Sequence, residues 1–386
     1  MSETATTSAR RSRQLDIDAL RREFPIVNEL VYLNSAATGP ISLPCQRAMN
    51  RQTDERLRFG NLKLKDWEQG AEEVRAKLAQ LINVETTGVG FVKNTSDAIS
   101  IIATGLDWRP GDNIVLAQSD FPSNFHAWLR AREHGVEIRF VADRGGRTCI
   151  DDIRPLVDKK TRLVSLSFVR FDTGFRIDLA ALGEICRATN TLLMVDVIQG
   201  LGALRVDASA NGISILVCGS HKWMMGPMGI GFLYINNDAL SQVRVNQLGW
   251  KNVVDAFGLS SPVEMVPGAR RFESGTENWT GILGLGAALK LYNDFGTDVA
   301  QTRVLMLNDY LRNGLKRAAY EVLSPGDVNE RSGVLICRST SHDAATVTKR
   351  LANENIIVVP RGAGVRIAPH YFNTTAELDQ LFAALP

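Results

Sequence analysis

A lysine near the middle of the chain follows an apolar run and precedes a glycine-rich turn. Residues 213–218 are largely apolar and lead into Gly219-Ser-His-Lys222, and a second apolar run follows at 231–235. Burial in such a position would lower the pKa of Lys222, and a neutral amine can form a Schiff base with a carbonyl. The alternative is a solvated loop lysine. The segment therefore suggests a nucleophilic amine.

A carboxylate ends another apolar run upstream of this lysine. Residues 192–195 are apolar, and Asp196 and Gln199 follow them. Because an unpaired buried carboxylate is costly, Asp196 needs a cationic partner. The protonated ring nitrogen of pyridoxal phosphate would be such a partner, and its charge keeps that ring an electron sink. The alternative is an aspartate that caps a following helix.

A third group of polar residues follows the apolar run 88–92. Thr95 and Ser96 stand at the start of a helix-like stretch, just after Asn94. Free backbone N–H groups, the helix dipole and two hydroxyls together make an anion site into which a phosphate fits. The alternative is ordinary N-capping by Thr95 or Ser96.

Apolar runs alternate with amphipathic stretches through this part of the chain, which predicts an α/β fold with a mostly parallel sheet covered on both faces. The expected strands are 88–92, 113–117, 137–141, 161–168, 192–195, 213–218 and 231–235. The expected helices are 96–106, 123–134, 151–156 and 179–189. In such sheets ligands lie beyond the carboxyl ends of the strands, where the lysine, the carboxylate and the hydroxyls stand.

The chain is long enough for two lobes. We expect a flexible tail at 1–15, a segment beside the cleft at 16–58, a large domain at 59–295 and a small α+β domain at 296–386. The small domain is predicted from a long helical pattern followed by short elements. Their expected ranges are 299–319, 333–337, 342–354, 365–367 and 375–385.

Composition excludes several classes of protein. With 44 Lys+Arg against 42 Asp+Glu, the formal net charge is +2, and no basic stripe suggests nucleic-acid binding. No apolar run is long enough for a membrane span. The cysteines are odd in number and form no C-x-x-C, which argues against a disulfide framework or a metal site and favours a cytoplasmic protein. They are Cys45, Cys149, Cys186, Cys218 and Cys337.

The order of phosphate site, carboxylate and lysine, each after a predicted strand, resembles the class V aminotransferase family of pyridoxal-phosphate (PLP) enzymes. That family includes cysteine desulfurases, selenocysteine lyases, kynureninases and isopenicillin-N-epimerase-like proteins. The resemblance runs from Tyr32 to Thr374. It implies PLP fold type I, with a mostly parallel, seven-stranded-like sheet in the large domain. It also implies a homodimer.

By this resemblance, Lys222 is the lysine that joins the cofactor through an aldimine. Asp196 pairs with the pyridine nitrogen, and Gln199 lies near the ring hydroxyl. Thr95 with the backbone of Ser96 belongs to the phosphate cup, which includes two further residues, Ser220 and His221. Thr276 would reach the phosphate of the neighbouring subunit.

The resemblance also implies a substrate-binding arginine. Arg366 matches the arginine that grips the substrate carboxylate, for which a guanidinium fork is well suited. An ordinary surface ion pair is the alternative. Asn34 and Asn124 are expected to contact the substrate too. Further pocket candidates are Ala36, His126, Arg361 and His370.

Two features depart from the desulfurases. Where those enzymes stack a histidine on the cofactor, this chain has Phe121, which can stack but cannot transfer protons; core filling is the alternative. The desulfurase loop that carries the persulfide-forming cysteine matches 358–365, which has no cysteine, and Cys337 lies in an apolar run expected to be buried. The family's asparagine-like residue near the ring hydroxyl of the cofactor corresponds to the stretch Arg170-Phe-Asp172 in this chain.

The reading that follows is a PLP-dependent enzyme acting on an L-amino acid. Lys222 would act as the base at Cα. The outcome would be transamination or β-elimination, the latter of a C–S lyase type without a persulfide. Two alternatives stay open at this point: an amino-acid epimerase, and a non-catalytic relative that binds PLP without turnover.

Overall fold

A seven-stranded sheet forms the centre of the computed structural model, which describes residues 16–259 and 262–386. Its strand order is β2-β8-β7-β6-β5-β3-β4. β8 runs antiparallel to both neighbours, and the other pairs are parallel, so the predicted mostly parallel sheet is confirmed. The strands are β2 (Val89–Val92), β3 (Asn113–Ala117), β4 (Glu137–Val141), β5 (Thr161–Ser167), β6 (Leu192–Asp196), β7 (Ile215–Gly219) and β8 (Gly231–Ile235).

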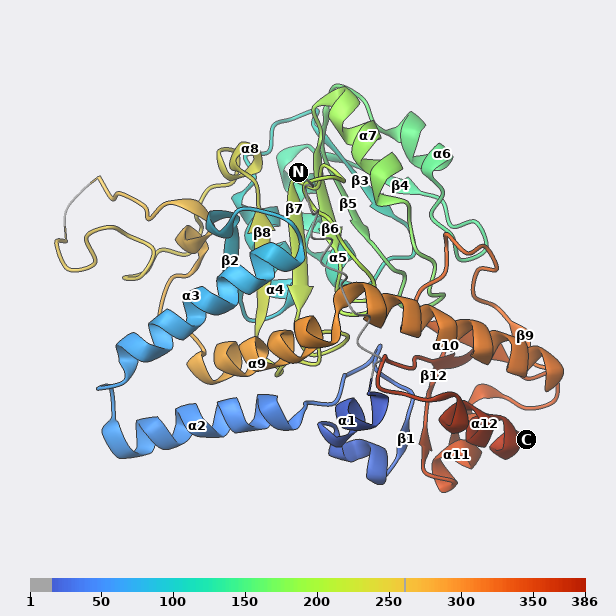
Figure 1. Cartoon of the computed structure of the whole chain (residues 1–386). Coiled ribbons are helices and arrows are strands. Elements are labelled where there is room, and N and C mark those ends of the chain that lie inside the picture. Colours follow the sequence, from blue (N-terminus) through green and yellow to red (C-terminus); the bar gives the residue numbers. More distant parts are fainter. Residues whose placement is uncertain (1–15, 260–261) are drawn as a thin grey trace, which may run out of the picture.

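Helices cover both faces of this sheet because its strands are apolar on both sides. The face of the sheet that carries the side chain of Val115 packs against α3 (Leu64–Leu81), α7 (Leu179–Thr189) and α9 (Trp279–Phe295). The opposite face, which carries the side chain of Leu116, packs against α4 (Thr95–Gly105) and Trp128. Figure 1 shows α7 and α9 on the sheet. Further helices are α5 (Ser123–His126), α6 (Ile150–Ile153) and α8 (Asn237–Leu240).

A second, four-stranded sheet follows in the C-terminal part, in the order β12-β13-β10-β9. It shares an apolar core with one face of α10, the long helix that Figure 1 shows between the two sheets. The elements are α10 (Thr297–Arg317), β9 (Glu321–Val322), β10 (Leu335–Arg338), α11 (Ala344–Asn353), β12 (Val359–Arg361), β13 (Gly364–Ile367) and α12 (Thr375–Ala384).

The first described residues join this C-terminal part. β1 (Val31–Tyr32) pairs in parallel with β11 (Ile356–Ile357), and α1 (Ile17–Arg22) is tied by Arg21, whose Nη1 donates to the carbonyl of Phe372 at 2.9 Å. α2 (Leu43–Phe59) then packs along α9. The tail predicted at 1–15 lies outside the described residues.

Two predicted helices are shorter than expected. The stretch 123–134 forms α5 followed by a 3₁₀ turn, Leu129–His134, which ends at Gly135 in the left-handed region (φ 74°). The stretch 151–156 forms α6 and a 3₁₀ turn, Arg154–Leu156, because Pro155 has no N–H for a helical hydrogen bond. In the described part of the chain, no helix is long and apolar enough to cross a membrane.

A buried ion pair fastens the segment before α9 to the sheet. Arg75 of α3 and Glu273 are both buried, with Nη1 and Oε1 at 2.6 Å. The same carboxylate oxygen accepts the backbone N–H of Phe91 in β2 at 2.7 Å. Because both charges are removed from water, loss of Glu273 leaves the buried Arg75 with only the exposed Glu72, at 3.2 Å, as an ionic partner among the described residues.

We therefore expect Glu273→Ala to lower the free energy of unfolding by about 3–5 kcal/mol. Glu321→Ala, which breaks the exposed pair between Glu321 and Arg338, serves as the matched control and should cost about 1 kcal/mol or less. Urea unfolding of the two variants and the parent measures both. Equal losses in the two variants would contradict the structural role assigned to the buried pair.

Candidate active site

The carboxyl ends of five strands meet at one edge of the large sheet. β2 is followed by Thr95, β3 by Phe121, β5 by Phe171 and β7 by Lys222, and β6 ends at Asp196. These strands share one direction, since β2 and β7 both run antiparallel to β8. Residues far apart in the sequence are thereby brought to one place.

The N-terminal segment closes over the backbone of Lys222. The N–H of Gly39 donates to the carbonyl of His221 at 2.8 Å. A Cβ on Gly39 would lie 2.1 Å from the carbonyl oxygen of Lys222, so a side chain there would collide with the backbone. Gly39 therefore brings the N-terminal segment against the backbone of Lys222.

Burial tunes the Lys222 amine. Desolvation lowers its pKa to about 8, opposed by the attraction of Asp196; Arg366 and Arg361 lower it further. Nζ lies 5.5 Å from the centroid of the Phe121 ring. At pH 7 about a tenth of Lys222 is therefore a free amine, far more than for a solvated loop lysine.

Asp196 is a deeply buried carboxylate, with 2% of its surface exposed. Oδ1 accepts the N–H of Ile198 at 2.9 Å, and no other described residue donates a hydrogen bond to the side chain. Desolvation raises its pKa to about 7, and neighbouring Asp120 adds to the rise. The residues that follow form a turn and not a helix, so Asp196 does not cap one.

Asp120 is a site residue that the sequence reasoning missed. Its carboxylate accepts Ser167 Oγ at 2.5 Å, the Ser167 N–H at 2.9 Å and the N–H of Phe121 at 2.6 Å. Desolvation raises its pKa. An acidic residue directly before an aromatic one, after a strand, is the signal that would have found it. It joins the loop after β3 to the end of β5 and so positions Phe121.

Phe121 is not a core residue, because 39% of its surface is exposed. Its ring meets the edge of Phe171 with centroids 5.2 Å apart and an interplanar angle of 84°. Asn124, in contrast, is buried, and its Nδ2 donates to Asp120 at 2.9 Å while its Oδ1 accepts Ser165 Oγ at 2.6 Å. In this arrangement Asn124 supports Asp120, and its substrate contact stays a prediction.

The start of α4 presents free donors at the same edge. Asn94, and neither Thr95 nor Ser96, is the N-cap, since it accepts the N–H of Asp97 at 2.9 Å. Thr95 Oγ1 accepts the N–H of Gly219 at 2.9 Å, which joins α4 to β7. Ser96 Oγ lies 2.6 Å from Ser123 Oγ. Within residues 16–259 and 262–386, the N–H groups of Thr95 and Ser96 have no acceptor.

Two predicted cofactor contacts, Ser220 and Gln199, have other partners in the structure. Ser220 Oγ lies 2.7 Å from the carbonyl of Pro227 and 2.9 Å from that of Ile230, so its single proton is directed at the backbone. Gln199 donates to the carbonyl of Ala36 and accepts the indole N–H of Trp223, both at 3.0 Å. Burial and nearby Lys222 lower the pKa of His221.

Arg366 is buried, with 2% of its surface exposed, and it is not a surface ion pair. Nη1 donates to the carbonyl of Phe171 at 3.2 Å, whereas the buried Nε has no hydrogen-bond partner. Burial, helped by the nearby charge of Arg361, lowers its pKa to about 10. No carboxylate of the described residues pairs with it. The guanidinium is thus available to an anion from outside the chain.

The remaining candidates are either buried, as Asn34 and His370 are, or exposed. Asn34 is buried near this site through its bridge to Ala368, and its Oδ1 has no hydrogen-bond partner. His370 is fully buried and bonded to the carbonyl of Trp223 at 2.8 Å; burial lowers its pKa to about 4, so it serves the scaffold as a neutral ring. His126 and Thr276 are exposed.

Cys337 lies inside the small sheet. It is buried in β10, and desolvation raises its pKa to about 12. The segment 358–365 forms the hairpin of β12 and β13, whose strands pair directly through Arg361 and Gly364. A reactive thiolate is therefore not available from Cys337.

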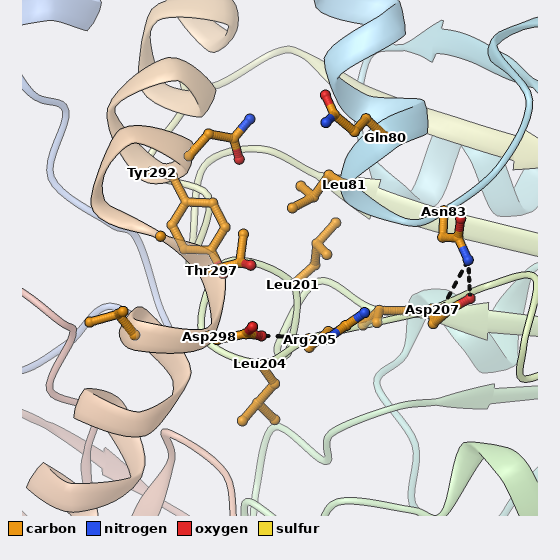
Figure 2. A pocket seen from close by; sticks show the side chains of 14 residues that line it. Gln80, Leu81, Asn83, Leu201, Leu204, Arg205, Asp207, Tyr292, Thr297 and Asp298 are labelled. Carbon is orange, nitrogen blue, oxygen red and sulfur yellow. Dashed lines mark hydrogen bonds and ion pairs between the residues drawn. The ribbon is translucent and has the colours of Figure 1, made fainter. Parts of the chain in front are cut away.

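A separate cavity of about 640 Å³ lies between the ends of α3 and α9 and the start of α10 (Figure 2). Figure 2 shows its hydrogen bonds between Asn83 and Asp207 and its ion pair between Arg205 and Asp298. Lys222, Asp196 and Arg366 do not line it. It is separate from the site described above.

Comparison with known proteins gives a family match over most of the chain. The family model Aminotransferase class-V matches residues 31–377. A probable cysteine desulfurase from Methanothermobacter thermautotrophicus is 33% identical over 390 residues, which cover 94% of this chain and 95% of that protein.

Solved structures share the fold. Apo cysteine desulfurase from Thermococcus onnurineus has a TM-score of 0.88 at 23% identity, over 96% of this chain and 97% of that one. The cystine C–S lyase C-DES, in complex with its reaction product cysteine persulfide, has a TM-score of 0.87 at 23% identity, over 93% of this chain and 98% of that one.

The pKa of Lys222 makes a prediction for the protein without added ligands. Labelling of Lys222 by trinitrobenzenesulfonate, followed by peptide mass spectrometry, should rise with pH around a midpoint of about 8. Because Asp196 favours the charged amine, Asp196→Asn should move that midpoint to lower pH. Asp294→Asn, which removes a carboxylate beside exposed Lys290, is the control and should leave it in place. An upward or absent shift in Asp196→Asn would contradict the proposed electrostatics.

Proposed function

Because the chain belongs to the class V aminotransferase family, as its motifs predicted, we propose that it is a PLP-dependent enzyme that removes the Cα proton of an L-amino acid with Lys222. The family uses PLP, and C-DES has been solved with glycine covalently linked to its PLP cofactor. The observation that carries the proposal is a buried amine with a pKa of about 8 beside a buried carboxylate.

The residues present fit PLP. Asp196 has an oxygen without a donor and needs a cationic partner, and a protonated ring nitrogen is one. The free N–H groups at the start of α4, a helix of 11 residues, suit a phosphate. Exposed Phe121 offers a ring face for stacking beside Lys222. When bound, PLP supplies an aldehyde for the amino group and a ring that stabilises negative charge at Cα.

Each side chain of the site then has its own role in the proposed reaction. Arg366 binds the substrate carboxylate through its guanidinium, which has no acidic partner among the described residues, and so orients the Cα–H bond. Lys222 accepts the Cα proton, since burial keeps part of it neutral near pH 7. Asp196 would pair with the ring nitrogen of bound PLP and keep it protonated. Asp120, by fixing the loop of Phe121, maintains the stacking surface.

The groups that can carry a proton at this site decide which reactions we propose. Lys222 is the proton carrier, and Phe121 beside it has no proton to give. We propose β-elimination, in which a β-substituent leaves with its electron pair, or transamination. A persulfide on Cys337 is not part of the proposal, because that thiol is buried with a raised pKa. Thr276 as a contact to the neighbouring subunit remains a proposal from family resemblance, as does the homodimer.

Product analysis of the PLP-loaded protein tests this function. We expect an L-amino acid to be converted either to an oxo acid with release of ammonia or to an oxo acid with transfer of its amino group to the cofactor. Lys222→Ala should lower the rate by at least about 100-fold, which is the contribution of a general base. Conversion to the other stereoisomer alone would overturn the proposal in favour of an epimerase. Absence of turnover with every proteinogenic L-amino acid and with L-cystine would identify a non-catalytic relative.

Cys337→Ala is the matched control for this experiment. Turnover should stay within about twofold of the parent, since the buried thiol takes no part. A complete loss of sulfur release in a correctly folded Cys337→Ala protein would contradict elimination without a persulfide.

A further inference from the structure

A second arginine stands beside the substrate-binding candidate Arg366. In the hairpin of β12 and β13, Val359 lies opposite Arg366 and Arg361 lies opposite Gly364. Residues directly opposite each other, and residues two apart on one strand, share a face of the sheet. The side chains of Arg361 and Arg366 therefore project from the same face as diagonal neighbours.

Gly364 places no side chain opposite Arg361. A Cβ on Gly364 would lie 2.3 Å from the carbonyl oxygen of Cys337 in β10, so the close approach of β10 requires glycine. With no side chain opposite it, Arg361 reaches over the ring of Phe171, with Cζ 5.7 Å from the ring centroid. The carbonyl of Phe171 in turn accepts Nη1 of Arg366. The two arginines thus converge on one residue at the end of β5.

Neither guanidinium has an acidic partner. Across the described ranges, no Asp or Glu lies within ion-pair distance of Arg361 or Arg366, and the buried Nε of each has no hydrogen-bond acceptor. By contrast, Arg170, which directly precedes Phe171 in the loop after β5, is paired with both Asp143 and Asp172. The half-buried guanidinium of Arg361 repels the buried guanidinium of Arg366, and it lowers the pKa of Arg366. Anions from outside the chain would relieve this repulsion.

The phosphate of PLP does not supply both anions. The start of α4, which suits a phosphate, is joined to the end of β7 through Thr95 and Gly219. Phe171, on which the arginines converge, follows β5, and β6 with Asp196 lies between β7 and β5 in the sheet. The arginines therefore stand on the substrate side of Asp196.

From this arrangement we propose that the substrate carries two anionic groups. Arg366 binds the α-carboxylate, and Arg361 binds an oxyanion at the end of the side chain, such as a carboxylate. The substrate class is thus an acidic L-amino acid or an amino acid with a second carboxylate. This inference rests on the function proposed above and specifies its substrate.

Isosteric ligand pairs test the inference. L-aspartate and L-asparagine are titrated into the PLP-loaded protein while the absorbance of the cofactor is followed, and succinate and succinamate are compared by calorimetry without reliance on turnover. The parent should bind the member with two carboxylates about ten- to a hundredfold more tightly, the value of a charged hydrogen-bonded contact. Arg361→Gln should remove this preference, and Arg361→Lys should retain part of it.

Arg338→Gln is the matched control, because Arg338 lies in the same small sheet but pairs with Glu321 at the surface. It should keep the preference of the parent. Equal binding of both members by the parent, or a preference that survives in Arg361→Gln, would overturn the two-anion substrate while leaving the proposed function intact. If succinate is preferred through Arg361 but no amino acid is turned over or changes the absorbance, the second anion site stands and the proposed function fails.

Discussion

The structure depends on cationic side chains buried at one sheet edge with few internal anions to balance them. Arg366 and Arg361 lower the pKa of Lys222, Arg361 also lowers the pKa of Arg366, and Asp196 is the carboxylate that favours the charged lysine. Such an excess of buried positive charge is costly in the empty protein and favourable once anionic ligands enter. The site is therefore built to take up a phosphate and carboxylates, and the same burial leaves part of Lys222 neutral and able to act as a base.

The fold maintains this charge arrangement by distributing its members over independent elements. Lys222 and Asp196 follow neighbouring strands of the large sheet, whereas both arginines stand on a hairpin of the small sheet. The contact of Arg366 with the carbonyl of Phe171 joins the two sheets at the site. Because the groups come from separate parts of the chain, local sequence changes can alter the substrate-facing hairpin while the lysine and the carboxylate stay in place.

Much of the fold followed from the sequence, since continuous apolar strands between amphipathic helices have few solutions other than a covered, mostly parallel sheet. The strands at 113–117, 137–141 and 231–235 agree with the structure residue by residue, and family membership agrees with the motifs. Side-chain partners could not be predicted in this way. Ser220, Asn124 and His370 are held by backbone or buried polar groups that only the tertiary contacts reveal, and the pairing of Arg361 with Arg366 depends on hairpin register.

Chemical mapping of the cofactor attachment point tests the central claim most directly. The protein is incubated with PLP, reduced with borohydride, digested and examined by peptide mass spectrometry. The account predicts a stoichiometric phosphopyridoxyl group on Lys222, which burial makes the reactive amine at this edge of the sheet. Labelling scattered over surface lysines, or unchanged total labelling in Lys222→Ala, would contradict it.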